Sequence, residues 1–142
     1  MFVSYPAVFY KKSNEEGYTV LFPDLKDCVT SGKNVNEAFL MASDALCTYL
    51  YYFFIQGKKF PIASDICHVS VKPSAEDRDY NYEGSFKSLV GANFDEYLKK
   101  SESKVVRKSL TIPSYLNEMG KSMNVNFSQI LTDALKNEFD ID

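Results

Sequence analysis

The sequence predicts an α+β protein of two domains, residues 1–100 and 101–142. Near the start, apolar residues alternate in two stretches with a period of two. From residue 35 to about 55 they recur every three or four residues. A second period of two, at 105–112, stops at a proline and gives way to helical spacing. Because strands repeat every 2.0 residues and helices every 3.6, both domains should contain both kinds of element.

The first two alternating stretches, 2–12 and 18–22, predict a β-hairpin around the sequence SNEEG. Gly17 can adopt the positive φ that such a turn requires. Pro6 lies inside the first stretch and has no amide to donate, so it favours an edge strand or a strand that begins there. The alternating apolar residues are Tyr5, Ala7, Phe9, Tyr18, Val20 and Phe22.

The segment after the hairpin predicts the longest helix, from about 35 to 55. Asn34 is a suitable N-cap, and Glu37 three residues later completes a capping box. Gly57 is placed to end the helix. The apolar stripe consists of Val35, Ala38, Ala42, Ala45, Tyr49 and Phe53. In the aromatic run that ends the helix, Tyr51, Tyr52 or Phe54 is expected to be exposed as a partner surface.

Shorter elements complete the first domain. A third strand is expected at 28–32, a further strand at 66–73 and another at 85–90. Residues 73–84 are polar and rich in turn formers, which predicts a loop. A short helix is expected at 93–100, followed by a linker at 101–104.

The second domain should contain one strand and two helices. In the strand, Arg107, Ser109 and Thr111 alternate with a second side made of Val106, Lys108, Leu110 and Ile112. Pro113 ends the strand. The first helix then has Leu116, Met119 and Met123 on one face. Asn126 caps the second helix, Gln129 completes a capping box, and the apolar face is Ile130, Leu131, Ala134, Leu135 and Phe139.

A single strand cannot satisfy its own backbone, and about forty residues are too few to bury a core alone. Two copies solve both problems, because their strands can pair antiparallel while four helices enclose a shared core. The sequence therefore predicts a homodimer through residues 101–142 and leaves open whether dimers associate further.

Composition limits the possible functions. Hydrophobic residues make up 45% and charged residues 25% of the chain, which suits a packed core. The net charge of −3 gives no global basic signature, so nucleic-acid binding requires a local patch. One exists at residues 99–108, where Lys99, Lys100, Lys104, Arg107 and Lys108 accompany a single acid, Glu102.

Other classes find little support. The three cysteines are far apart and form no motif with histidine, so neither disulfides nor a zinc site is expected. The N-terminus lacks the pattern of a signal peptide. The most apolar run, residues 49–55, is shorter than the roughly 20 residues that cross a bilayer. We expect a cytoplasmic protein without a cofactor.

The strand, the proline and the two short helices of a dimerising domain resemble the ribbon-helix-helix DNA-binding family of the MetJ/Arc type. In that family, alternate polar side chains of the paired strands enter the major groove. The resemblance implies that Arg107, Ser109 and Thr111 read bases. Phosphates would be held by Lys104, Lys108 and the start of the second helix at Asn126, Phe127 and Ser128. Lys108 stands where the family usually has an apolar residue.

The first domain resembles the HicB antitoxin family. The matching elements are YPAVF at 5–9, GYTVLFPDL at 17–25, the CVTSG strand, the capped helix, and SFKSLVGANFDEYLKK at 85–100. The resemblance leaves out an insert at about 60–84. Lys26 and Asp27 stand where the family commonly has Pro-Gly.

This resemblance implies a β-β-β-α-β domain with a partial ribonuclease H-like fold that binds and occludes a HicA-type mRNA-cleaving toxin. The toxin-binding residues would include Pro23, Asp24, Leu25 and Asp27. The second domain would repress the shared operon by binding operator DNA. An acidic first domain suits a basic, RNA-binding toxin.

Metal-dependent catalysis needs several carboxylates around Mg²⁺, and the spacing of Asp24, Asp27, Glu37 and Asp44 does not bring all four together. A lone histidine such as His68 is more often structural than catalytic. The chain is therefore not expected to be an enzyme. The alternative is a stand-alone repressor of the ribbon-helix-helix type whose first domain senses a small ligand.

Overall fold

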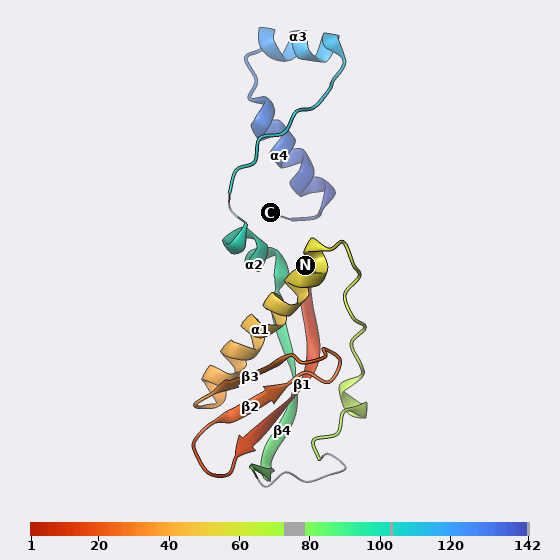
Figure 1. Ribbon diagram of the computed structural model, residues 1–142. Coiled ribbons are helices and arrows are strands. Elements are labelled where there is room, and N and C mark those ends of the chain that lie inside the picture. Colours follow the sequence, from red (N-terminus) through yellow and green to blue (C-terminus); the bar gives the residue numbers. More distant parts are fainter. Residues whose placement is uncertain (73–78, 103, 142) are drawn as a thin grey trace. The chain divides into compact units, whose positions relative to one another are not determined.

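The computed structural model describes residues 1–72, 79–102 and 104–141. The chain divides into two compact units, Phe2–Tyr97 and Leu98–Asp142, with Met1 assigned to the second. The first unit is an antiparallel sheet covered by a long helix, and the second carries two short helices (Figure 1). The mixed α and β architecture agrees with the predicted fold class.

The sheet contains β1 (Phe2–Lys12), β2 (Tyr18–Leu21), β3 (Val29–Gly32) and β4 (Tyr80–Asn93), in the order β3-β2-β1-β4. The predicted hairpin is confirmed, since β1 and β2 pair with Phe9 opposite Val20. Gly17 has a φ of 117° in its turn, as expected.

The position of β1 corrects the prediction from Pro6. The strand lies between β2 and β4, so it is not an edge strand. Pairing with β2 begins only at Val8, whereas β4 pairs along the strand from Phe2. Pro6 pairs with Leu89 of β4 on one side, and on its other side β1 has no neighbouring strand. The missing amide of Pro6 therefore breaks no hydrogen bond on that open side.

Helix α1 (Val35–Ile55) packs on one face of the sheet, where the Phe39 and Phe9 rings lie 4.4 Å apart. The Asn34 side chain accepts the Glu37 amide at 2.8 Å, which confirms the N-cap. Gly57 ends the helix with a φ of 65°, and the Lys58 amide reaches back to the Phe53 carbonyl. Length and composition alone would also let α1 cross a membrane, but the core helix of a soluble protein passes the same test.

The segment 58–72, which we call the strap, crosses to the other face of the sheet. The Tyr5 hydroxyl donates to the Pro61 carbonyl at 2.6 Å, and the Lys87 ammonium donates to the carbonyls of Ile66 and Val69. Val8 pairs with Lys87 and is buried on this face. As a result, the stretch of β1 from Tyr5 to Phe9 is buried on both sides.

The strand predicted at 66–73 is wrong. Ile66–His68 form a single 3₁₀ turn, η1, and no residue from 66 to 72 is in a strand. The physical reason is position: this segment lies over the face of the sheet, where ladder hydrogen bonds are not available. Instead the Asp65 side chain caps the turn by accepting the Cys67 amide.

The predicted loop at 73–84 is corrected in its second half, because β4 begins at Tyr80; residues 73–78 lie outside the described part of the chain. Tyr80 and Tyr82 pack against Tyr10 of β1, with ring centroids 5.2 and 6.0 Å from it. Because cross-strand aromatic contacts stabilise paired strands, they explain why this otherwise polar stretch extends the ladder between β1 and β4.

Helix α2 (Phe94–Ser101) follows β4 directly and confirms the predicted short helix. In the second unit, α3 (Ser114–Ser122) begins after Pro113, and α4 (Phe127–Glu138) is capped by Asn126. The second capping box is wrong in one respect: the Gln129 side chain donates to Asp133. Residues 104–112 form no strand within the single chain.

Candidate functional site

The segment 104–112 lies beside α4 in the second unit. Arg107 and Lys108, together with Ser128 and Thr132 of α4, line an open groove of about 500 Å³. All residues of the segment are exposed. The predicted base-reading and phosphate-binding side chains of this segment are therefore accessible in the single chain.

The apolar side of the same segment faces a second groove. Leu110 and Ile112 line it together with Ile130, Leu131 and Ala134 of α4. Lys108 borders both grooves, which fits its unusual place on the predicted inner side. Leu110 and Ile112 therefore lie beside apolar residues of α4, whereas Val105 and Val106 line the first groove together with Arg107 and Lys108.

The start of α4 has a defined geometry. The Asn126 side chain accepts the Gln129 amide at 3.0 Å, and the helix begins at Phe127 and Ser128. A Cβ on the buried Gly120 of α3 would collide with the Phe127 ring, so that ring packs directly on α3. The backbone amide of Phe127 can therefore bind an anion, whereas its side chain packs against α3.

Large apolar side chains are exposed throughout the second unit. Those on the segment and the two helices include Leu110, Ile112, Tyr115, Leu116, Met119, Met123, Phe127, Ile130, Leu131, Leu135 and Phe139. A soluble monomer rarely exposes so much contiguous apolar surface. The second unit therefore exposes apolar side chains of the kind that normally pack in a hydrophobic core.

In the first unit, the loop between β2 and β3 holds the other predicted site residues. Pro23 is exposed, whereas Leu25 is only 1% exposed and cannot offer its side chain to a partner. The Asp24 carboxylate accepts from the amide of Ser64 at 2.9 Å and from its hydroxyl, which ties the loop to the strap. Asp27 is exposed, with a φ of 62°.

Asp24 also affects its surroundings. Burial raises the pKa of the Tyr5 hydroxyl, and the negative charge of Asp24 raises it further. Tyr5 therefore keeps its proton and remains a donor to the strap. Neither Ser64 nor Lys87 carries a sequence signal for this role, because each contact joins residues far apart in the chain.

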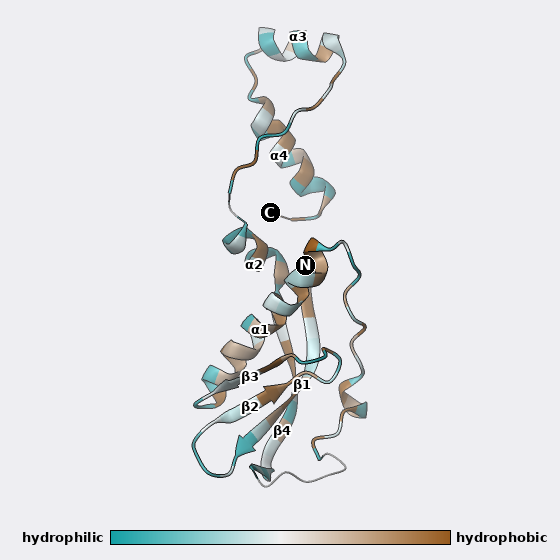
Figure 2. Ribbon diagram, viewed as in Figure 1, coloured by the Kyte–Doolittle hydropathy of each residue, from teal (hydrophilic) through white to brown (hydrophobic). Residues whose placement is uncertain are grey.

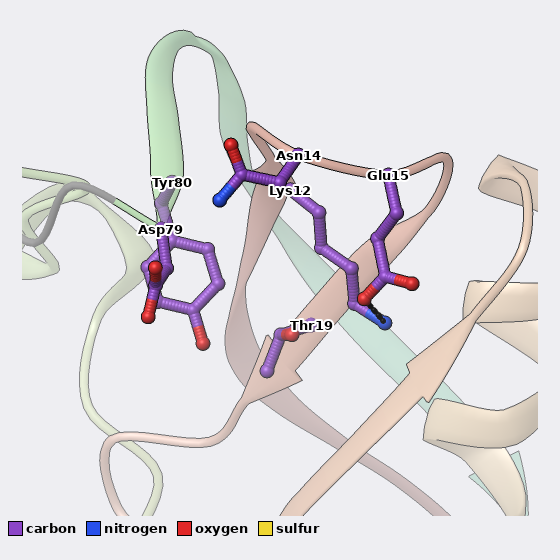
Figure 3. Close-up of a pocket in the computed structure, with 6 residues that line it drawn as sticks. All are labelled: Lys12, Asn14, Glu15, Thr19, Asp79 and Tyr80. Carbon is purple, nitrogen blue, oxygen red and sulfur yellow. Dashed lines mark ion pairs between the residues drawn. The ribbon is translucent and has the colours of Figure 1, made fainter.

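A polar pocket of about 250 Å³ lies at the turn of the β1–β2 hairpin (Figure 3). It is lined by Lys12, Asn14, Glu15, Thr19, Asp79 and Tyr80. Lys12 and Glu15 form an ion pair with a nitrogen–oxygen distance of 3.6 Å. Its lining contains neither a histidine nor a cysteine.

Catalytic groups are not assembled elsewhere in the described ranges. Among those residues no three His, Cys, Asp or Glu side chains could hold a metal ion together. All three cysteines are free, and burial raises the pKa of the Cys28 and Cys47 thiols, which disfavours the reactive thiolate. His68 is exposed in η1.

The comparison with protein families decides the identity. Residues 5–134 match the model of a family described as the HicB-like antitoxin of a bacterial toxin-antitoxin system. The chain belongs to this HicB-like antitoxin family. It is a family of antitoxins and not of enzymes, in agreement with the expectation from the sequence.

Two curated HicB antitoxins of Photorhabdus laumondii are similar to part of the chain. Antitoxin HicB 2 is 37% identical over 60 residues, which cover 42% of either protein. Antitoxin HicB 1 is 38% identical over 52 residues, 37% of this chain and 34% of the relative. The alignments thus span less than half the length of these relatives.

Solved structures match over nearly the whole chain. A chain from a toxin–antitoxin complex of Streptococcus pneumoniae is 33% identical, with a TM-score of 0.64; the match covers 97% of this chain and 99% of that one. The HicB antitoxin of Burkholderia pseudomallei has the same fold at 20% identity, with a TM-score of 0.52 and coverage of 94% and 96%.

Proposed function

We propose that this HicB-like chain is the antitoxin of a type II toxin-antitoxin system in the cytoplasm. Its first domain, residues 1–100, binds and occludes a HicA-type mRNA-cleaving toxin. Its second domain, residues 101–142, represses the shared operon. The observation that carries the proposal is the family match over residues 5–134, supported by 33% identity to a chain of a toxin–antitoxin complex.

Charge supports a basic toxin as the partner of the first domain. The unit Phe2–Tyr97 contains nine Lys and Arg against thirteen Asp and Glu. An acidic surface accelerates the encounter with a basic protein and disfavours acidic competitors. Within the loop between β2 and β3, Pro23 and Asp27 are the proposed contacts, and Asp24 acts by holding the strap.

DNA binding requires a dimer in which the segments 105–112 of two chains form an antiparallel ribbon. Arg107, Ser109 and Thr111 then share the outer face and reach base edges in the major groove. Lys104, Lys108 and the amides at the start of α4, beside Asn126, Phe127 and Ser128, hold phosphates.

The exposed apolar surface of the second unit supports the dimer. Leu110 and Ile112 already face α4, and the remaining apolar side chains of α3 and α4 need a partner to leave water. A second copy supplies both the missing strand and the missing half of the core. Further association of dimers would proceed through other surfaces.

Co-expression tests the division of labour. Residues 1–100 should restore growth to cells that express the toxin encoded beside this chain's gene, and residues 101–142 should not. Protection by the second fragment alone would overturn the proposal. Failure of the whole chain to bind the toxin, together with a small ligand in the purified protein, would establish the alternative of a ligand-sensing repressor.

A further inference from the structure

The outer side of α1 carries an unusual set of residues. A stripe of exposed or partly exposed positions, separated by three or four residues, runs the length of the helix, which places them on one side. We call it the outer stripe; it consists of Glu37, Met41, Asp44, Thr48, Tyr52 and Ile55. The opposite side packs on the sheet through Ala38, Ala42, Leu46 and Leu50.

The outer stripe is too apolar for a face that meets only water. Tyr52 and Ile55 are 58% and 59% exposed, and Leu40 beside the stripe is 71% exposed. Only five of the 21 residues of α1 are buried. Figure 2 shows hydrophobic colour extending to the C-terminal end of the helix. A helix that is apolar on both sides is normally covered on both sides.

The polar part of the outer stripe has one sign of charge. Glu37 and Asp44 are acidic, and α1 contains neither lysine nor arginine. The Thr48 hydroxyl lies 3.4 Å from that of Tyr97, so α2 borders the stripe and adds the exposed Glu96. A complementary surface would have apolar side chains flanked by Lys or Arg.

We propose that the outer stripe of α1 is a docking surface for the toxin. This inference rests on the proposed antitoxin function and names the helix face that performs it. The Cys28 thiol lies 3.9 Å from the Ala45 carbonyl, so the loop holding Pro23 and Asp27 ends against the middle of the same helix. The loop therefore contacts the helix that carries the outer stripe.

Two other occupants fit the outer stripe less well. In a symmetric dimer of this face, Asp44 lies near the middle of the stripe and would approach its own copy, which places like charges together. A membrane would have to take up the carboxylates of Glu37 and Asp44, which are costly to bury in lipid. A basic protein surface gains from the same two carboxylates.

The test uses the full-length chain and the toxin encoded by the neighbouring gene, with affinities measured by calorimetry. Ile55→Arg should weaken binding by roughly tenfold or more, because it places a cation in an apolar contact facing a basic partner. The matched control is Ile62→Arg on the strap, where the isoleucine is 92% exposed and lies outside the stripe. This control should bind like the unmodified chain.

A second pair tests the charge. Asp44→Lys should slow association and reduce its dependence on salt, whereas Glu16→Lys, the same charge change in the β1–β2 turn, should do neither. Thermal unfolding and operator binding of each variant report whether it is folded.

The outcomes distinguish failure of the antitoxin function from failure of the docking surface. If the unmodified chain does not bind the toxin, the antitoxin function fails. If it binds, but Ile55→Arg and Asp44→Lys bind as tightly as their controls, the docking surface is overturned while the function stands. Loss of self-association in Ile55→Arg without loss of toxin binding would assign the outer stripe to a second copy and also overturn the inference.

Discussion

Asp27 and Asn124 have positive φ angles, 62° and 54°, which are normally occupied by glycine. Both have short polar side chains that tolerate this conformation better than other residues, at a cost of roughly 1 kcal/mol. Asp27 thus holds, at a small cost in stability, a conformation that glycine adopts freely, and glycine is the residue expected here from the resemblance to the HicB family.

Replacing Asp27 by glycine should raise the free energy of unfolding by up to about 1 kcal/mol, because the strain at positive φ is removed. Asp27→Val should lower it by about 1–2 kcal/mol. Urea denaturation measures both changes. Lys26→Gly is the matched control: its φ is not positive, so the added glycine should only destabilise. Equal effects of glycine at both positions would contradict this explanation.

Arg107 and Lys104 should differ in what they recognise. Arg107 shares the outer face of the proposed ribbon with Ser109 and Thr111, so Arg107→Ala should cost about 1–3 kcal/mol on the cognate operator and relax one base position per half-site. Lys104→Ala should weaken all duplexes alike and lower the salt slope by about one per subunit. Titrations on cognate and scrambled DNA at several salt concentrations separate the two. Equal losses on both duplexes for Arg107→Ala would show that it does not read sequence.

At the scale of elements, the sequence predicted the features that depend on residues close together in the chain. The caps at Asn34 and Asn126, the turn at Gly17 and the helix end at Gly57 were all predictable, because each depends on residues within a few positions. The path of the strap was not predictable. It depends on Lys87 and Asp24, which lie 18 or more residues away from their partners in the chain.

The central position of β1 in the sheet could not be predicted for a similar reason. Pro6 correctly marks a position without a hydrogen-bonding neighbour on one side, but the sequence does not show that β4 covers the other side. For the candidate site, alternation gives Arg107, Ser109 and Thr111 as candidates on a segment that is exposed, whereas the burial of Leu25 is visible only in the folded loop.

The contact between α1 and β3 depends on Gly32. A Cβ at this position would meet the backbone of Ala38, so Gly32→Ala must push α1 away from the sheet. The free energy of unfolding should fall by about 1–3 kcal/mol, as for other overpacked cores. Gly57→Ala is the comparison, since its Cβ would meet nothing within 4 Å and only the positive φ is penalised, at about 1 kcal/mol. A smaller loss at Gly32 than at Gly57 would contradict the close packing.

At the scale of the whole molecule, the proposed function assigns two surfaces of different character to two partners. Residues 101–142 should be dimeric as an isolated segment, with a melting temperature that rises with concentration, because folding and association bury the same apolar side chains. Analytical ultracentrifugation and thermal melts over a range of concentrations measure this. A folded monomer at micromolar concentration would rule out the ribbon.

The pairing of β1 with β4 joins Phe2 to Asn93, the two ends of the first unit. During synthesis, the hairpin and α1 can form early, but β1 keeps one open edge until β4 has been made. The 45 residues of Leu98–Asp142 then require roughly 2–9 s more at typical translation rates. The half proposed to neutralise the toxin can therefore mature on the ribosome before the half proposed to silence transcription exists, and this order would favour protection of the cell over shutdown of the operon.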